Sequence, residues 1–195
     1  MLKGIKLRLY PNAKQRDQLA QMFGNARFIW NIMLNMANER YKNNPSSSFV
    51  NEYGMNYLVK QLKQEYSFLK ESDSSSLQVS NHNLDQSFKM LFKHQGGYPR
   101  FKSRKSSKQS YTGKSTCKVI AKRRTKLAKL GSIRTSKTSR LINCKIKRYT
   151  VTLDSTGRYY LSLMVDDPNI QPLEPTGAVV GIDMGVADLA ITSDG

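Results

Sequence analysis

The residue of this chain that is best placed to do chemistry is Asp183. It follows a short apolar run, Ala178–Ile182, and precedes a glycine, a tight turn and a second apolar run over residues 189–192. A two-metal site for phosphodiester cleavage needs several carboxylates that converge on ions ~4 Å apart. This segment places one carboxylate at the end of a strand. Asp188 and Asp194 lie in or near turns, where solvated side chains are expected.

The distribution of charge is the second chemical feature. The net charge is +18 at pH 7, and residues 86–153 contain 20 Lys and Arg but no Asp or Glu. The rest of the chain holds 12 basic and 14 acidic residues. An acid-free basic block in an otherwise balanced chain predicts a polyanionic partner, with strongly salt-dependent binding. The alternatives are a solvated or disordered basic segment and an anionic membrane surface, although no amphipathic helix spans the block.

The composition argues against a membrane span, a secretory signal and a zinc site. Hydrophobic residues make up 38% of the chain, and no apolar run approaches the ~20 residues of a membrane span. Residues 1–6 contain no apolar signal core, so we expect a cytoplasmic protein. Cys117 and Cys144 are too far apart for a CxxC zinc knuckle, and His82 and His94 have no ligand-spaced partners, so ordinary thiols and surface histidines are expected.

The elements that position these residues can be read from periodicity. Residues 3–10 alternate as a half-buried strand, and Asn12 with Gln15 predicts a capping box before a helix with apolar spacing over 19–37. A second helix is expected from about Asn51 to Phe68. A third begins at Ser72–Ser74 and is broken by Gly96 and Gly97. The aromatic-rich stripes of these helices are interpreted as core.

Strands return towards the end of the chain. Residues 149–153 and 159–165 alternate on either side of the turn Asp154–Gly157, which predicts a β-hairpin. The segment from Asp166 to Gly177 contains three prolines and is expected to be a linker. Because a lone strand is not stable, we expect the first strand to pair with strands built after about residue 115. The helices are then an insertion within one β-domain.

Five short motifs occur in a fixed order along the chain. They are Arg8–Asn12, Phe23–Asn31, Gly97–Lys102, Lys126–Gly131 and Gly181–Ala190. Together they resemble TnpB, the transposon-encoded RNA-guided DNA endonuclease family, also known as OrfB-type transposases, and the resemblance covers essentially the whole chain.

The resemblance implies an α+β fold. The strands would form a wedge-like β-barrel with an inserted three-helix recognition lobe, often assigned as a helix-turn-helix, followed by the first hairpin of an RNase H-like nuclease domain. The boundaries would be 1–11 for the first barrel strand, 12–97 for the lobe, 98–167 for the basic loop and remaining strands, 168–177 for a linker and 178–195 for the hairpin.

The resemblance also implies partners and a cofactor. The partners are a guide RNA from the transposon end and double-stranded target DNA, with sequence read by base pairing. In the family, the carboxylate at Asp183 binds catalytic Mg²⁺ with two further carboxylates. This chain departs from the family because it carries neither those two carboxylates nor the zinc-binding Cys cluster. We therefore expect a truncated protein with weak or no Mg²⁺ binding, no zinc site and no cleavage activity by itself.

Nucleic-acid contacts are expected from the basic block and from one helix. Phosphate contacts and base stacking are predicted for two clusters of residues, Arg100, Phe101, Lys102, Arg104 and Lys105, and then Arg123, Arg124 and Lys126. Gln78 sits where the family reads DNA, and a Gln can contact adenine through two hydrogen bonds. Arg27 lies among apolar helix positions and has two open interpretations, a nucleic-acid contact or an internal ion pair.

Three alternatives remain at this stage. One is a generic basic RNA- or DNA-binding protein, and another is one part of a split Mg²⁺-dependent endonuclease to which Asp183 contributes. The third arises because residues 179–185 also resemble the phosphate-binding hairpin of the actin and sugar-kinase superfamily, although that hairpin normally opens a much longer domain. In every case the apolar side chains of the last hairpin are expected to be exposed.

Overall fold

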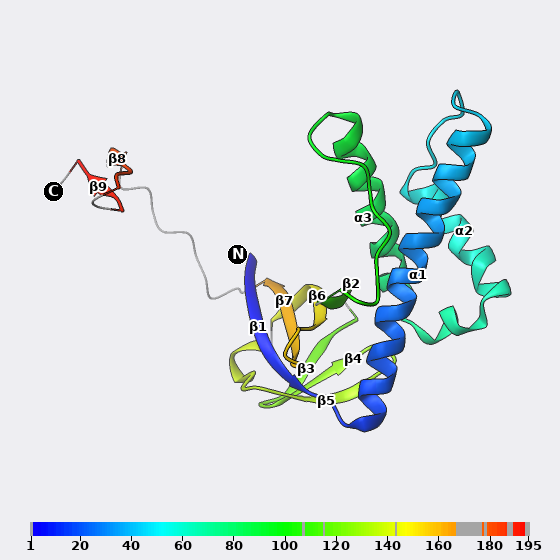
Figure 1. Cartoon of the computed structure of the whole chain (residues 1–195). Coiled ribbons are helices and arrows are strands. Elements are labelled where there is room, and N and C mark those ends of the chain that lie inside the picture. Colours follow the sequence, from blue (N-terminus) through cyan, green and yellow to red (C-terminus); the bar gives the residue numbers. More distant parts are fainter. Residues whose placement is uncertain are drawn as a thin grey trace.

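The computed structural model describes residues 2–106, 108–114, 116–142, 144–166, 177, 179–186 and 189–193 of the 195-residue chain. Its helices are α1 (Ala13–Asn43), α2 (Glu52–Glu65) and α3 (Ser74–Phe92), with short 3₁₀ helices at Ser67–Glu71 and Ser139–Leu141. Its strands are β1 (Leu2–Tyr10), β2 (Gln109–Lys114), β3 (Lys118–Ala121), β4 (Arg124–Leu127), β5 (Gly131–Thr135), β6 (Lys145–Leu153), β7 (Tyr159–Asp166), β8 (Ile182–Asp183) and β9 (Ile191–Thr192). The protein is therefore α+β (Figure 1).

Seven strands form one antiparallel sheet in the order β2-β6-β7-β1-β5-β4-β3. The first strand pairs with β7 from Leu2 to Leu9 and with β5 at Leu9 and Tyr10, which confirms the predicted pairing of β1 with later strands. The expected barrel is not observed. Closing a sheet requires its two edges to hydrogen-bond, and the edge strands β2 and β3 do not pair with each other. The sheet is therefore open, with β2 at one edge and the four-residue strand β3 at the other.

Strands are predicted after about residue 115, but the bounds of β2, β3, β4 and β5 come only from the structure. Residues 109–114 were expected to belong to a basic loop, but they form β2, which pairs with β6 and buries Tyr111. Strands β3, β4 and β5 carry many cations, and only alternate positions such as Leu127 and Ile133 face the core. The predicted hairpin is confirmed as β6 and β7, which are paired up to Leu153 and Tyr159.

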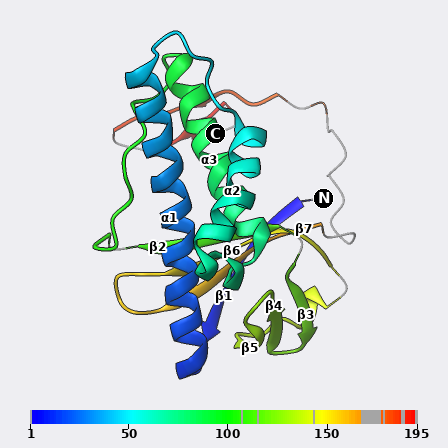
Figure 2. The same ribbon diagram turned by 90° about the vertical axis from the view of Figure 1, so that its right-hand side faces the viewer.

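Helix α1 joins two hydrophobic cores. Its first half packs on the sheet, and its second half packs against α2 and α3, as the long blue helix in Figures 1 and 2 shows. The residues of α1 that pack on the sheet are Leu19, Met22, Phe23 and Ala26. Those that pack in the helical lobe are Ile29, Trp30, Met33 and Leu34. One rigid helix therefore couples the sheet to the helical lobe.

The helix ends follow the predicted capping signals. Asn12 and Gln15 form the capping box of α1, with the Asn12 side chain accepting from the Gln15 N–H at 2.8 Å. The Gln15 amide also donates to the Ser132 carbonyl at 2.9 Å, which ties the start of α1 to β5. The end of α3 differs from the prediction. It ends at Phe92, before the two glycines, and His94 then adopts a positive φ of 56°.

The N-cap of α3 is a buried carboxylate that contacts the sheet. Asp73 accepts hydrogen bonds from the Ser75 N–H at 3.1 Å, the Thr116 hydroxyl at 2.6 Å and the Tyr149 hydroxyl at 3.0 Å. Burial by itself raises the pKa of Asp73, but these hydrogen bonds outweigh it and the net pKa is lowered. The start of α3 is therefore fixed to β6 and to the connection between β2 and β3.

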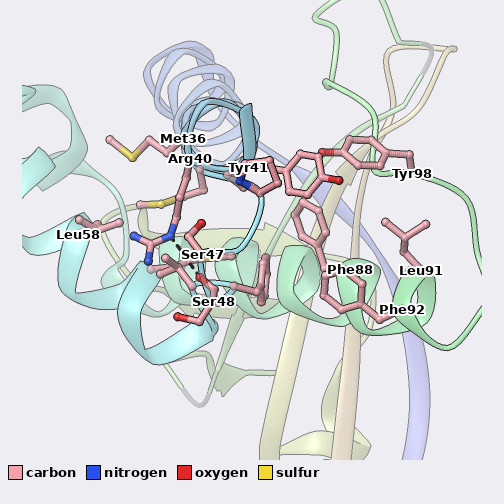
Figure 3. Close-up of a pocket in the computed structure, with 16 residues that line it drawn as sticks. Met36, Arg40, Tyr41, Ser47, Ser48, Leu58, Phe88, Leu91, Phe92 and Tyr98 are labelled. Carbon is pink, nitrogen blue, oxygen red and sulfur yellow. Dashed lines mark hydrogen bonds between the residues drawn. The ribbon is translucent and has the colours of Figure 1, made fainter. Parts of the chain in front are cut away.

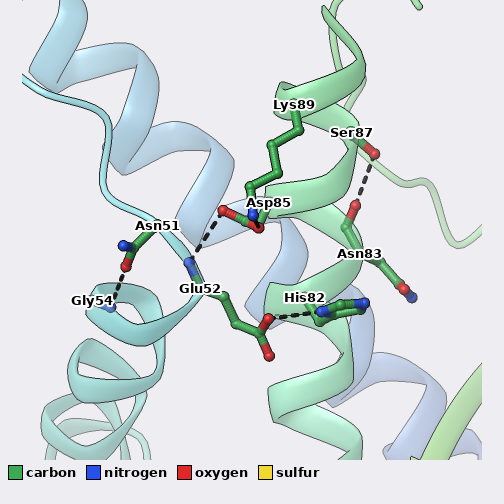
Figure 4. A network of polar contacts seen from close by, with 8 residues as sticks. All are labelled: Asn51, Glu52, Gly54, His82, Asn83, Asp85, Ser87 and Lys89. Atoms are coloured by element: carbon green, nitrogen blue, oxygen red, sulfur yellow. Dashed lines mark hydrogen bonds and ion pairs between the residues drawn. The ribbon is translucent and has the colours of Figure 1, made fainter. Parts of the chain in front are cut away.

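A polar network joins α2 to α3 (Figure 4). His82 Nδ1 lies 2.7 Å from Glu52 Oε2, and the Glu52 N–H donates to buried Asp85 at 3.3 Å. Asp85 also pairs with Lys89 at 2.6 Å. His82 is thus a structural residue of the lobe. No α-helix in the described part of the chain is long and apolar enough to cross a membrane.

Candidate nucleic-acid interface

The predicted cluster around Phe101 lies on a segment that runs back along α1. After α3, residues 93–108 return from the far end of the lobe to β2, shown in green in Figures 1 and 2. Tyr98 donates to Asn38 at 2.6 Å, and Trp30 Nε1 donates to the Arg100 carbonyl at 2.9 Å. The return segment therefore lies antiparallel to α1, which holds its basic residues in place.

Asn31 and Trp30 fix the centre of this segment. The Asn31 amide accepts from the Lys102 N–H at 2.8 Å and donates to the Lys102 carbonyl at 3.0 Å. The Lys102 ammonium lies 3.7 Å from the centre of the Trp30 ring, and desolvation there lowers the pKa of Lys102. Two motifs that are about 70 residues apart in sequence, Phe23–Asn31 and Gly97–Lys102, are thus brought into contact.

The other predicted members of the cluster face solvent. Phe101 is 56% exposed, and Arg100, Arg104 and Lys105 are exposed as well. The backbones of Arg100 and Lys102 are held by α1, whereas those of Arg104 and Lys105 bond to Gln109 and Ser103. The structure therefore presents these cations and one aromatic ring along a common segment.

The second predicted cluster lies around β4. Arg124 and Lys126 are exposed, whereas Thr125 and Leu127 between them are buried. Arg123 is also exposed and precedes the strand. The two clusters lie on separate elements, and no hydrogen bond or ion pair between them is found among the described residues.

Like charges face each other across these strands. Arg124 is directly opposite Arg134 of β5, and Lys126 is directly opposite Lys118 of β3. Like-charged cross-strand pairs destabilise an isolated sheet. A bound polyanion would remove this repulsion, so the arrangement is suited to phosphate groups.

The basic face continues across the middle of the sheet, which the sequence did not reveal. Arg134 lies 5.6 Å from the centre of the Tyr10 ring, and Arg8 lies 5.2 Å from the centre of the Tyr160 ring. Lys6 lies 4.3 Å from the centre of that ring. In the sequence, the alternation of Lys6 and Arg8 in the first strand already indicates a basic face on that strand. Only the sheet register shows that this face lies beside Tyr160 and Arg134.

Gln78 is exposed on α3, one turn after the N-cap. Two lysines contact this end of the helix. Lys63 of α2 donates to the Ser74 hydroxyl at 2.9 Å, and the Lys114 N–H donates to the Ser75 hydroxyl at 3.0 Å. Burial lowers the pKa of Lys63, and the nearby charge of Lys129 lowers it further. Gln78 therefore lies near the start of α3, where Lys63 and the Asp73 carboxylate are both close to the junction of the lobe and the sheet.

Asp183 lies in the small β8–β9 hairpin, where it is exposed and pairs with Ile191. Asp188 and Asp194 lie outside the described residues. Within the described residues no group of three or more His, Cys, Asp and Glu side chains gathers as a metal site would require. The expected exposure of the apolar hairpin residues is confirmed, with Val179 at 92% and Leu189 at 82%.

Comparisons with known proteins identify the family. A helix-turn-helix domain of the OrfB/IS605 type matches residues 1–45. Over essentially the full chain, the protein is 31% identical to the Escherichia coli (strain K12) protein named "Putative RNA-guided DNA endonuclease InsQ". The chain belongs to the TnpB family. A Streptomyces pristinaespiralis protein named "Putative RNA-guided DNA endonuclease" is also 31% identical, over 99% of this chain.

This TnpB-family chain spans about half the length of these curated relatives, 48% of each. The matched helix-turn-helix range corresponds here to β1, the long helix α1 and the start of the following loop. In this structure the matched range thus contains one helix, and that helix joins the sheet to the lobe.

An apolar pocket of the TnpB-family chain lies at the far end of the lobe (Figure 3). It has a volume of about 580 Å³ and its wall includes Phe88, Phe92 and Tyr98. Its one charged side chain, Arg40, donates to the Ser48 carbonyl at 3.2 Å. Phe88 is buried as predicted, but Phe92 is 58% exposed, so the aromatic stripe of α3 is core only in part.

Proposed function

We propose that this chain is a guide-RNA- and target-DNA-binding part of a TnpB-type RNA-guided system. The observation that carries the proposal is the pairing of like charges on the outer face of the sheet, Arg124 with Arg134 and Lys126 with Lys118. Together with the exposed cations of the return segment, these pairs favour a polyanionic partner. The names of the curated relatives support the choice of RNA and DNA as that partner.

Each basic surface has its own part in the proposal. The residues around Phe101 and around β4 contact phosphates, which gives affinity without base specificity. Gln78 is exposed near the start of α3 and is proposed to contact a base of the target DNA. The open sheet and the helical lobe, with the predicted boundaries at 11, 97, 167 and 177, are the proposed scaffold for both nucleic acids.

The primary experiment is to express the chain beside its native flanking DNA, purify it at moderate salt and sequence the RNA that co-purifies. One enriched RNA that maps next to the gene supports guide binding. A mixture of ribosomal and messenger RNA overturns it and leaves the generic nucleic-acid-binding alternative.

The salt dependence of binding tests the assigned cations. The triple variant Arg123→Gln, Arg124→Gln, Lys126→Gln should lower affinity for a labelled RNA and reduce the slope of log K against log salt by about 2, since each phosphate contact contributes ~0.7 for single strands. A control with the same change in charge is Lys42→Gln, Lys60→Gln, Lys70→Gln on exposed positions of the lobe. Equal slopes for the two variants would contradict the assignment.

Cleavage is proposed to need groups beyond those described here. Asp183 is a hard oxygen ligand suited to Mg²⁺, but a single exposed carboxylate does not fit a complete two-metal site. We therefore assign no cleavage step to this chain and expect it to be inactive by itself. Mg²⁺-dependent cleavage of DNA by the pure chain, lost in Asp183→Ala, would refute this.

A further inference from the structure

A polar pocket lies where α1, α3, β2 and the return segment meet. It has a volume of about 430 Å³. Its polar and charged lining residues include Arg27, Ser80, Asn83, Lys102, Lys108 and Gln109. No carboxylate lines the pocket among the described residues, so the charged side chains that line it are all cations.

Arg27 is held rigidly at this pocket. Its Nη1 donates to Gln109 Oε1 at 2.7 Å. The amide of Gln109 in turn donates to the carbonyls of Arg104 and Ser106, each at 3.0 Å. The first residue of β2 thus fixes both the guanidinium of α1 and the bend of the return segment.

The guanidinium has no carboxylate partner among the described residues. The internal ion pair considered from the sequence is therefore not present in this part of the chain. Burial lowers the pKa of Arg27, and the charge of Arg104 lowers it further. Two cations close together in a partly desolvated site repel each other, and a bound anion relieves that repulsion.

Phe101 separates this pocket from a second hollow of about 550 Å³. Arg27 and Phe101 line both spaces, and the second one also includes Phe28 and the exposed amide of Asn35. An aromatic ring with a neighbouring amide is suited to a nucleobase, which can stack on the ring and hydrogen-bond at its edge. A base can enter such a hollow only from an unpaired strand.

We propose that these two adjoining spaces bind one nucleotide unit of a single-stranded nucleic acid, with its phosphate on Arg27 and its base on Phe101. The planar guanidinium binds phosphate through two parallel hydrogen bonds. Lys108, which also lines the pocket, adds a further positive charge. This inference rests on the proposed nucleic-acid function and adds to it a defined site, a strand preference and a role for Arg27.

The test is a fluorescence-anisotropy titration of the full chain with a labelled 12-nucleotide RNA. The decisive variant is Asn83→Asp, which introduces a negative charge into the pocket at an exposed helix position with almost no change of shape. We expect Kd to rise about 10- to 100-fold, because repulsion by the new carboxylate should offset about one charge-assisted phosphate contact. The matched control is Gln64→Glu on exposed α2, which changes the charge by the same amount away from the pocket.

Two further variants distinguish the contribution of the phosphate contact from that of base stacking. Arg27→Gln should lower affinity for a normal and an abasic oligonucleotide alike, whereas Phe101→Leu should lower affinity only for the normal one. A 12-base-pair duplex should bind with little dependence on Phe101. Far-UV circular dichroism checks that each variant is folded.

Each outcome has a distinct meaning. Wild-type-like binding by folded Asn83→Asp and Arg27→Gln would overturn the nucleotide site and leave the proposed function standing. Equal losses for Asn83→Asp and Gln64→Glu would likewise overturn it, because they reflect net charge alone. Failure of the wild-type chain to bind any RNA would overturn the proposed function itself.

Discussion

The buried carboxylate Asp73 connects the helical lobe to the sheet, so its removal should destabilise the whole chain. In Asp73→Ala the α3 N-cap is lost, which costs ~1 kcal/mol. The Tyr149 side chain is fully buried, and losing Asp73 removes an acceptor from its hydroxyl. A buried hydroxyl without its partner costs a further ~1–3 kcal/mol. The free energy of unfolding should therefore fall by about 2–4 kcal/mol.

The assay is urea unfolding followed by circular dichroism, with Asp17→Ala as the control. Asp17 is exposed on α1, and its removal changes the net charge equally. Asp73→Asn keeps a capping side chain but no charge, so its loss of stability should be intermediate. If Asp73→Ala is no less stable than Asp17→Ala, the assignment of Asp73 as the junction between lobe and sheet is wrong.

The pH dependence supplies a second check on the same residue. The pKa of Asp73 is lower in the folded protein than its ordinary value of 3.8. Its charge therefore stabilises the fold above about pH 4, and this stabilisation is lost as pH falls through the folded pKa. The difference in unfolding free energy between wild type and Asp73→Asn should be full at pH 7 and should shrink at lower pH. A constant difference would contradict the reasoning.

Three other measurements test the packing around the proposed interface. Gly113→Ala should cost about 1–3 kcal/mol by chemical denaturation, because an added Cβ would lie 2.5 Å from the ring of buried Tyr149; unchanged stability would refute that contact. Trp30→Phe removes the hydrogen bond that holds the return segment, so trypsin should cut within residues 98–108 faster than in wild type; an equal rate would count against the attachment. Burial raises the pKa of the Cys117 thiol to about 12, so its reaction with DTNB at pH 8 should be on the order of a hundredfold slower in the folded than in the urea-unfolded chain.

Local patterns in the sequence were enough to predict the elements that depend on neighbouring residues. The capping box at Asn12, the hairpin turn at Asp154–Gly157 and the N-cap at Asp73 each require side chains only a few positions apart. The acid-free basic block and the basic cluster around Phe101 could also be identified from the sequence, because they depend on composition alone. Such features are determined by short-range geometry and composition.

The expectations that failed depended on long-range pairing. Strand β2 is polar in sequence and becomes a strand only because β6 supplies its hydrogen bonds and Tyr111 reaches the core. Closure into a barrel depended on the edges β2 and β3 meeting, and they do not pair. Hydrophobic periodicity carries no information about which strands are neighbours.

The sequence by itself determined that the chain carries an acid-free basic block, three helices and a hairpin, and that its motifs resemble TnpB. Only the tertiary structure decided what the cations face. Arg8 meets Tyr160 and Arg27 meets Gln109, and these partners are 152 and 82 positions apart. The physical reason is that sheet register and helix packing bring such residues together, and both depend on contacts between segments that are distant in the chain.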